Sequence, residues 1–354
     1  MTGMDPQQIQ MQIDMIKAQV EAQKDAYRQM YASDPAMVEQ ICSQLDQSIQ
    51  MQIQAIMQMN GVDDGPGCAA LDNQEETAIE QMGEGREPSF LESVNEGDYT
   101  LTESVLGSIS PSYFGYDEIM TVVSSLEWLE EREPLPADRK GMRRFEVLLT
   151  GIISTLNGHS LDGLEVGPRD VRNREMVEAI LEDWNVGGRN DLISVLEHLI
   201  QSGSTADYAT NLRLIYGGGS AQDLLRDDME RDEIIMSNSR YLFTEMYTGL
   251  YDQTMLRGWD LGRAANVTRW GYYMGYITED EAWEYLDQIA DGCMEAFDSW
   301  TSFAQSYLFG SMFWNCPWGP EDCHEKARYL MLAIEHLLTK GAWKDFPWAE
   351  GRAF

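Results

Sequence analysis

A group of polar and aromatic residues in the last third of the chain has the types and spacing that chemistry needs. Trp259, Arg263, Asn266 and Trp270 are separated by four, three and four residues, so one face of a helix would carry all of them. Asp260 stands three residues before Arg263, a spacing at which a carboxylate and a guanidinium meet on a helix. The sequence therefore predicts a helix with one face that joins two indoles to a charged pair and an amide.

This polar group admits two interpretations. In the first, Arg263 and Arg269 stack on indoles and pair with Asp260 inside a core, where they fix how two helices meet. In the second, the same side chains line a pocket for an anionic or polar ligand, with His159 as a possible base. No G-x-S-x-G pattern accompanies His159 to supply a nucleophile. The candidate polar site comprises six residues: Asp260, Arg263, Asn266, Arg269, Asn157 and His159.

Two other segments have features of metal or phosphate sites. Cys316, Cys323 and His324 lie close together, but no CxxC pair or second histidine cluster accompanies them, so they are weak zinc candidates and we expect no metal. The glycines at 217–219 precede a helix start at Ser220 but lack the Gly-Lys-Ser/Thr end of a phosphate loop, which favours a hinge. We therefore expect no cofactor.

The helices around the polar group can be placed from capping signals and apolar stripes. After Gly275, Thr278 and Glu281 form a capping box that begins a helix, and Ser299 begins the next. Large indole rings bury much apolar surface when they face a core. The expected aromatic framework consists of Trp259, Trp270, Trp283, Trp300 and Trp314.

These segments resemble a known family. The quoted stretches are GWDLGRAANVTRWGYYMGYITEDEAW and FDSWTSFAQSYLFGSMFW, with LLTGIISTLNGHSLDGL and EDWNVGGRNDLISVLEHLIQSG before them. They are similar to the bacterial domain-of-unknown-function family 1266, typified by YbeU-like and YbeR-like proteins, over roughly residues 140–348. The resemblance implies a mostly helical bacterial domain, and it implies no activity and no catalytic residues.

Glycine and proline boundaries divide the rest of the chain into further helices. The expected helices are Tyr116–Glu131, Asp138–Leu156, Arg174–Trp184, Asp191–Gln201, Asp207–Tyr216, a stretch from Ser220 that runs with breaks toward Asn266, and Pro320–Lys340. The predicted fold class is all-α, a multi-helix globular domain over residues 107–354.

The N-terminal part differs in composition. Residues 1–61 are rich in Met and Gln and have apolar residues at helical spacing, which predicts a helical hairpin. Residues 62–106 are acidic and contain many glycines, as expected of a linker with a helical restart near Thr102. The methionines indicate either self-association or docking of the hairpin on another helix, or its packing on the C-terminal domain.

The overall charge limits the partners. Sixty acidic and 25 basic residues give a net charge of −35, which repels nucleic acid and anionic membrane surfaces. It favours a basic protein partner, or serves solubility alone. No apolar run is long enough for a membrane span, no targeting segment is evident, and five scattered cysteines suit a reducing compartment. We therefore expect a cytoplasmic protein.

Two classes of function follow from these features. We favour a non-catalytic protein-interaction module that engages a basic partner, as an immunity or antitoxin protein would. The alternative is an enzyme or a small-ligand-binding domain with a polar site on the helix from Trp259 to Trp270. The two differ in whether Asp260 and Arg263 are sealed in the core or open in a cleft.

Overall fold

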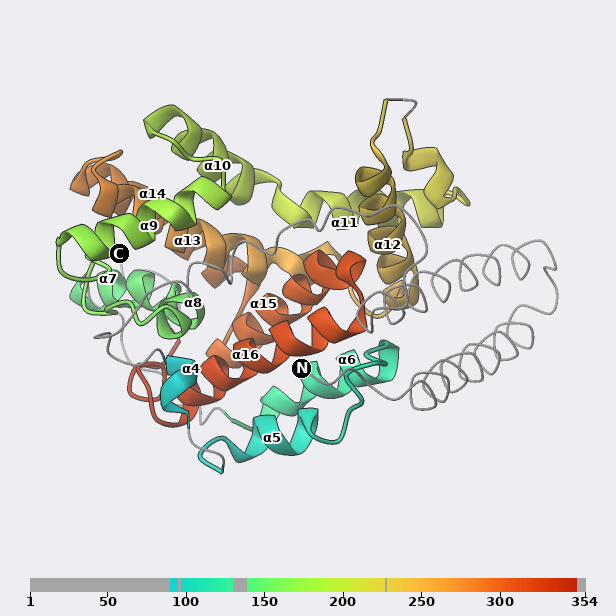
Figure 1. The fold of residues 1–354 in the computed structure, drawn as a ribbon, viewed down its shortest axis with the longest axis horizontal. Helices are drawn as coiled ribbons and strands as arrows, with labels where there is room; N and C mark the ends of the chain where they lie inside the picture. The colour runs from blue at the N-terminus through green and yellow to red at the C-terminus, as the bar shows by residue number, and fades with distance from the viewer. Residues whose placement is uncertain (1–89, 95–96, 130–138, 227, 349–354) are drawn as a thin grey trace, which may run out of the picture. The chain divides into compact units, whose positions relative to one another are not determined.

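The computed structural model describes most of the C-terminal part of the chain, residues 90–94, 97–129, 139–226 and 228–348. The chain divides into two units, residues 1–72 and 73–354, and only the second contains described residues. The hairpin predicted for residues 1–61 and the linker up to residue 89 lie outside them. The described residues form helices and connecting loops with no strand, so the predicted all-α class is confirmed (Figure 1).

Helix α13 (Arg257–Met274) is the centre of the fold. It packs against α10 (Arg189–Gln201), α14 (Glu279–Ala296) and α15 (Trp300–Asn315). Almost every one of its residues is buried, on all sides of the helix. A helix surrounded in this way belongs to the core of the domain.

Glycines let the neighbouring helices approach α13 closely. A Cβ atom placed on Gly262 would lie 2.6 Å from the ring of Tyr307 on α15, and one placed on Gly271 would lie 2.3 Å from Leu192 on α10. Any larger side chain at these two positions would push the helices apart. The glycines of the GWDLGR and RWGYY segments are therefore packing positions.

The predicted end of α13 and the predicted start of α14 are confirmed. Gly275 adopts the left-handed conformation, with φ at +79°, and ends α13. The Thr278 hydroxyl accepts from the backbone N–H of Glu281 at 3.3 Å, and the Glu281 carboxylate accepts from the backbone N–H of Thr278 at 2.8 Å. These reciprocal bonds form the predicted capping box.

An aromatic cluster joins α15 to the C-terminal segment. Trp300 stacks on Trp343 with ring centres 4.7 Å apart and planes 9° apart, and its Nε1 donates to the carbonyl of Phe346 at 2.6 Å. Helix α16 (Pro320–Thr339) packs beside α15, as the centre of Figure 1 shows. The segment after α16 thus folds back over the core.

The helix predicted for residues Asp138–Leu156 is wrong in one respect, because it is broken into α7 (Arg139–Leu148) and α8 (Gly151–Leu156). The break frees the carbonyl of Leu148, which accepts from Trp343 Nε1 at 2.9 Å. Gly151 makes room for that indole, since a Cβ there would lie 3.0 Å from the same nitrogen. Tertiary contacts therefore stabilise the break.

The remaining elements surround this core. They are α4 (Phe90–Ser93), α5 (Thr100–Leu106), α6 (Tyr116–Ser124), η1 (Ser125–Trp128), α9 (Val171–Asp183), α11 (Gly203–Tyr216), η2 (Ala221–Leu224), α12 (Arg231–Tyr247), η3 (Gln253–Leu256) and η4 (Cys316–Trp318). Figure 1 shows α5 and α6 on one side of α15 and α16, and α9 and α10 on the other. Helix α5 begins close to the predicted restart at Thr102.

Candidate polar site on helix α13

Asp260 caps a helix that belongs to a different part of the chain. Its carboxylate accepts from the backbone N–H groups of Ser204 at 2.9 Å and Thr205 at 2.8 Å, and from the Thr205 hydroxyl at 2.6 Å. These groups form the N-terminus of α11, where free N–H groups and the helix dipole favour an anion. Gly203 makes this approach possible, because its φ is +52° and a Cβ there would lie 2.3 Å from the carboxylate carbon. Asp260 is fully buried.

Arg263 lies between Asp260 and three indoles. Its Nη2 donates to Asp260 Oδ1 at 3.4 Å, so the predicted pair forms. Its guanidinium carbon lies 4.2 Å from the ring centre of Trp259, 5.0 Å from that of Trp314 and 5.1 Å from that of Trp184. Cation–π attraction and the ion pair together compensate for the loss of water around this group. Only 9% of Arg263 is exposed.

A second guanidinium, that of Arg240, faces one of these three indoles, Trp314. Arg240, on α12, places its guanidinium carbon 4.3 Å from the ring centre of Trp314. Burial is the main reason that the pKa of Arg240 is lowered, and the nearby Arg263 adds to the effect. Arg240 was not among the predicted residues, because nothing in its spacing links it to the residues of α13.

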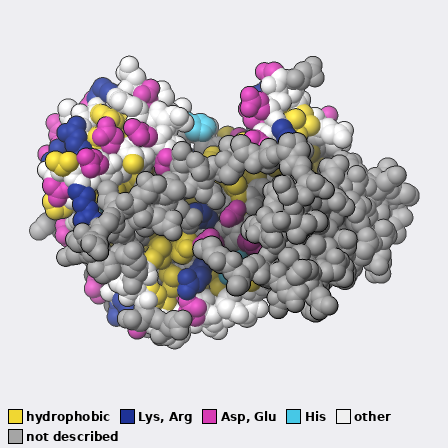
Figure 2. Space-filling model, viewed as in Figure 1, with side chains coloured by type: hydrophobic (Ala, Val, Ile, Leu, Met, Phe, Trp, Pro, Cys, Tyr) yellow, Lys and Arg dark blue, Asp and Glu magenta, His cyan; other side chains and the backbone are white. Residues whose placement is uncertain are grey.

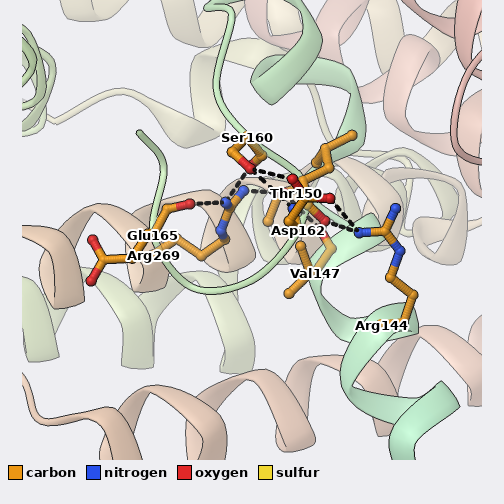
Figure 3. Close-up of polar contacts among 8 residues, drawn as sticks. Arg144, Val147, Thr150, Ser160, Asp162, Glu165 and Arg269 are labelled. Carbon is orange, nitrogen blue, oxygen red and sulfur yellow. Dashed lines mark hydrogen bonds and ion pairs between the residues drawn. The ribbon is translucent and has the colours of Figure 1, made fainter. Parts of the chain in front are cut away.

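Arg269 occupies a different environment from Arg263. Its Nη1 donates to the hydroxyls of Thr150 at 2.8 Å and Ser154 at 3.0 Å, and its Nη2 donates to the carbonyls of Ser160 at 2.5 Å and Glu165 at 3.0 Å (Figure 3). The stacking on an indole that was expected of Arg269 is replaced by these oxygen acceptors. Burial lowers its pKa to about 10, with a further contribution from Arg144, so it stays charged at neutral pH.

Arg269 and Arg144 together hold the loop between α8 and α9. Arg144, on α7, donates to the carbonyl of Leu161 and lies 3.8 Å from Asp162. Figure 3 shows the two arginines reaching the loop from opposite sides. The loop carbonyls therefore face inward, and the carboxylate of Glu165 points away from Arg269 (Figure 3).

The other predicted site residues contribute to the packing between α13 and α8. Asn266 donates to the carbonyl of Gly262 at 2.9 Å, and its Oδ1 accepts from Ser154 at 3.4 Å. His159 is buried, and its Nδ1 accepts from Trp270 Nε1 at 3.4 Å. Burial, followed by the charge of Arg269, lowers the pKa of His159 to about 3, so the ring is neutral at physiological pH.

The six residues therefore separate into two buried groups instead of lining one cleft. Asp260 and Arg263 face α11, whereas Asn266, Arg269 and His159 face α8 and the loop after it. Asn157 lies half-buried at the end of α8. None of the six lines either of two surface pockets in the described part of the chain, which measure about 600 and 500 Å³.

The weak zinc candidates point at backbone carbonyls. Cys316 Sγ lies 3.2 Å from the carbonyl of Phe313, and Cys323 Sγ lies 3.9 Å from that of Met312. Burial raises the pKa of the Cys323 thiol to about 12, which keeps it protonated and a poor metal ligand. Within the described ranges, no three His, Cys, Asp or Glu side chains are grouped for a metal ion.

The expected aromatic framework lies in and around this core. Trp259, Trp270 and Trp300 are buried, and Trp283 and Trp314 are half-buried. The sequence did not identify Trp184, which completes the surroundings of Arg263.

The fold and the buried groups define an all-α domain in which a central helix carries internal charged contacts. Residues 179–348 match the model of the family described as "Protein of unknown function (DUF1266)". This match confirms the predicted similarity to family 1266 over residues 179–348, and it begins after α7 and α8. Comparisons with curated proteins and with solved structures found no match. Every helix in the described part of the chain is too short or too polar to cross a lipid bilayer.

Proposed function

We propose that this protein is a non-catalytic, cytoplasmic protein-binding module with a basic partner, of the kind that an immunity or antitoxin protein has. The observation that supports this proposal is the enclosure of Asp260 and Arg263. Their charged groups bind the N-terminus of α11, three indoles and each other. An enzyme or ligand-binding site on α13 would need these groups open to a cleft.

With the α13 groups enclosed, carboxylates are the main charged groups left for recognition at the surface. Figure 2 shows acidic side chains over the α9–α10 part and over the α12 part of the described surface. Helix α14 contains no basic residue, and five of its acidic residues share one face, at spacings of four, three, four and four: Asp280, Glu284, Asp287, Asp291 and Glu295. That face lies opposite the buried stripe of Leu286 and Cys293.

A carbodiimide crosslinker, which joins carboxylates to lysines, tests the proposal in cells that produce the protein. The test variant neutralises three carboxylates of α14, with Asp280→Asn, Glu284→Gln and Asp291→Asn. The matched control neutralises three exposed carboxylates of α9, with Glu175→Gln, Glu178→Gln and Glu182→Gln. Both variants change the net charge equally. Three exposed ion pairs contribute on the order of 1.4 kcal/mol, so the α14 variant should bind the crosslinked partner about 10-fold more weakly.

Two results would contradict the proposal. Equal weakening in both variants would mean that net charge alone attracts the partner, without a defined surface. The absence of any crosslinked partner, together with a small molecule that raises the melting temperature, would favour the ligand-binding alternative.

A further inference from the structure

The larger of these two surface pockets lies beside the loop between α8 and α9, which Arg144 and Arg269 hold. It measures about 600 Å³ and is bounded by residues of the loop 160–168 on one side. Tyr272 near the end of α13, and Glu279 and Trp283 in the first turns of α14, form the other side. Helix α13, the centre of the fold, thus contributes to this surface pocket together with α14 and the loop 160–168.

The loop wall is held in place by the protein itself. Arg269 binds two of its carbonyls, those of Ser160 and Glu165, and the Tyr273 hydroxyl donates to the carbonyl of Pro168 at 2.5 Å. The backbone N–H of Ser160 donates to the carbonyl of Val166 at 2.8 Å. A ligand would meet a preorganised wall and would not have to order the loop.

The lining combines aromatic rings with carboxylates. Its ring-bearing side chains are Tyr272 and Trp283, and its charged side chains are Asp162, Glu165 and Glu279. Lysine and arginine are absent from the lining residues. Aromatic faces beside carboxylates attract cations, and they attract a flat guanidinium most strongly because it stacks as well.

The protein's own arginines show that these rings accept guanidinium groups. Arg143 places its guanidinium carbon 4.6 Å from the ring centre of Trp283, and Arg169 places its own 5.2 Å from that of Tyr272. Both rings therefore already contact guanidinium groups of the protein itself.

The carboxylates differ in how far their charge is already compensated. Glu165 pairs with Arg169 at 2.8 Å, and Asp162 lies 3.8 Å from Arg144 with its side chain 96% exposed. Glu279 accepts from Trp283 Nε1 at 3.4 Å, and it forms no ion pair with a residue that the structure describes. Glu279 is thus the carboxylate best placed to bind an incoming cation.

We propose that this pocket receives an arginine side chain of the basic partner, with the guanidinium paired to Glu279 and packed against Trp283. This inference rests on the proposed function, and it identifies one contact between this protein and the basic partner. Helix α14 supplies both Glu279 and the acidic face described above, so a basic segment on that face has the pocket beside it.

The test titrates the full chain with N-acetyl-arginine amide and follows the indole Nε1 signal of Trp283 by NMR. The Trp283→Phe variant assigns that signal. We expect a saturable shift with the arginine probe and none with N-acetyl-citrulline amide, which has nearly the same shape and no charge. Glu279→Gln should weaken binding at least about 3-fold, as the loss of one exposed ion pair does. Glu178→Gln, which removes an exposed carboxylate of α9 outside the pocket, is the control and should change binding less than about 1.5-fold.

Three results would overturn the inference: an equal shift with citrulline, no saturable shift with arginine, or equal weakening by Glu279→Gln and Glu178→Gln. Failure of the probe, with a crosslinked partner that still depends on α14, would reject the pocket and leave the proposed function intact. A saturable arginine shift without any crosslinked partner would support a guanidinium site and reject the proposed function.

Discussion

Asp260 and Arg269 lie on the same buried helix, but the protein surrounds their charges in different ways. Asp260 meets two backbone N–H groups at the start of α11 and the guanidinium of Arg263. Arg269 meets hydroxyl and carbonyl oxygens only, among its hydrogen-bond partners in the described structure. One charge is thus balanced by an opposite charge and a helix dipole, and the other is solvated by neutral groups.

This difference indicates what each group does for the fold. Asp260 fixes one helix against another, because its cap works only if α11 begins at Gly203. Arg269 fixes a loop, because two of its partners are loop carbonyls. A second helix is capped by a carboxylate from a distant part of the chain. Glu335 on α16 accepts from the N–H groups of Leu101 and Thr102 at the start of α5, at 3.1 and 2.8 Å.

The largest expected effect is that of Asp260→Ala. The change removes the cap of α11 and leaves a buried guanidinium without its carboxylate, so it should lower the free energy of unfolding by about 3–5 kcal/mol. Urea denaturation measures it. Asp252→Ala is the matched control, since Asp252 caps η3 at the surface and its loss should cost about 1 kcal/mol. An Asp260→Ala curve that overlays that of the parent protein would reject the structural role of the pair.

The next effect concerns the approach of the carboxylate to α11. Gly203→Ala places a Cβ 2.3 Å from the Asp260 carboxylate carbon at a φ of +52°, so it should cost on the order of 2–4 kcal/mol. Gly158→Ala is the control, because Gly158 has a φ of +67° with nothing within 4 Å. It should cost only about 1 kcal/mol.

Both costs are again measured by urea denaturation. Equal costs for the two glycine variants would mean that backbone strain alone decides, and that the contact with Asp260 contributes nothing.

Much of this fold could be predicted from the sequence, because its signals are local. The capping box at Thr278, the helix end at Gly275 and the pair of Asp260 with Arg263 each involve residues within one turn of each other. Such contacts form wherever the helix forms. The partner Trp184 could not be found in this way, because only the tertiary fold brings it to Arg263.

The errors have the same physical origin. Helix α11 was expected to begin at Asp207, but it begins at Gly203, since its cap comes from Asp260 and not from the preceding residue. The break between α7 and α8 was missed because Trp343 and Arg269 stabilise it from distant positions. Helix boundaries fixed by another part of the chain leave no local signal.

The third prediction tests the neutral surroundings of Arg269. Arg269→Met removes a donor from four uncharged oxygens and leaves no buried charge, so it should cost about 2–3 kcal/mol, less than Asp260→Ala. Its clearest consequence should be local: the amide of Ser160, bonded to Val166, should exchange hydrogen at least about 10-fold faster.

Arg169→Met provides the control for Arg269→Met, because it removes an exposed arginine that also contacts the loop, through Glu165. It should cost under about 0.5 kcal/mol. Global destabilisation by Arg269→Met with unchanged exchange at Ser160 would contradict the role of Arg269 in holding the loop.

The smallest effect depends on pH and involves His159, the neighbour of Arg269. Burial and that guanidinium lower its pKa from 6.5 to about 3, so the unfolded chain binds a proton between these values and the folded chain does not. The contribution of the neutral ring to stability is therefore complete above about pH 6.5 and decreases as the pH falls toward 3.

Integrating that difference gives a loss of about 2 kcal/mol between about pH 7.5 and 5. His159→Gln removes the titrating group but keeps an oxygen that can accept from Trp270 Nε1, so its free energy of unfolding should fall by about 2 kcal/mol less than that of the parent over the same range. Urea denaturation at both pH values gives the comparison. Because the many carboxylates titrate in both proteins, the difference between the two slopes isolates His159. Parallel slopes would mean that the ring is accessible to protons in the folded state, and that Arg269 and the loop do not seal it.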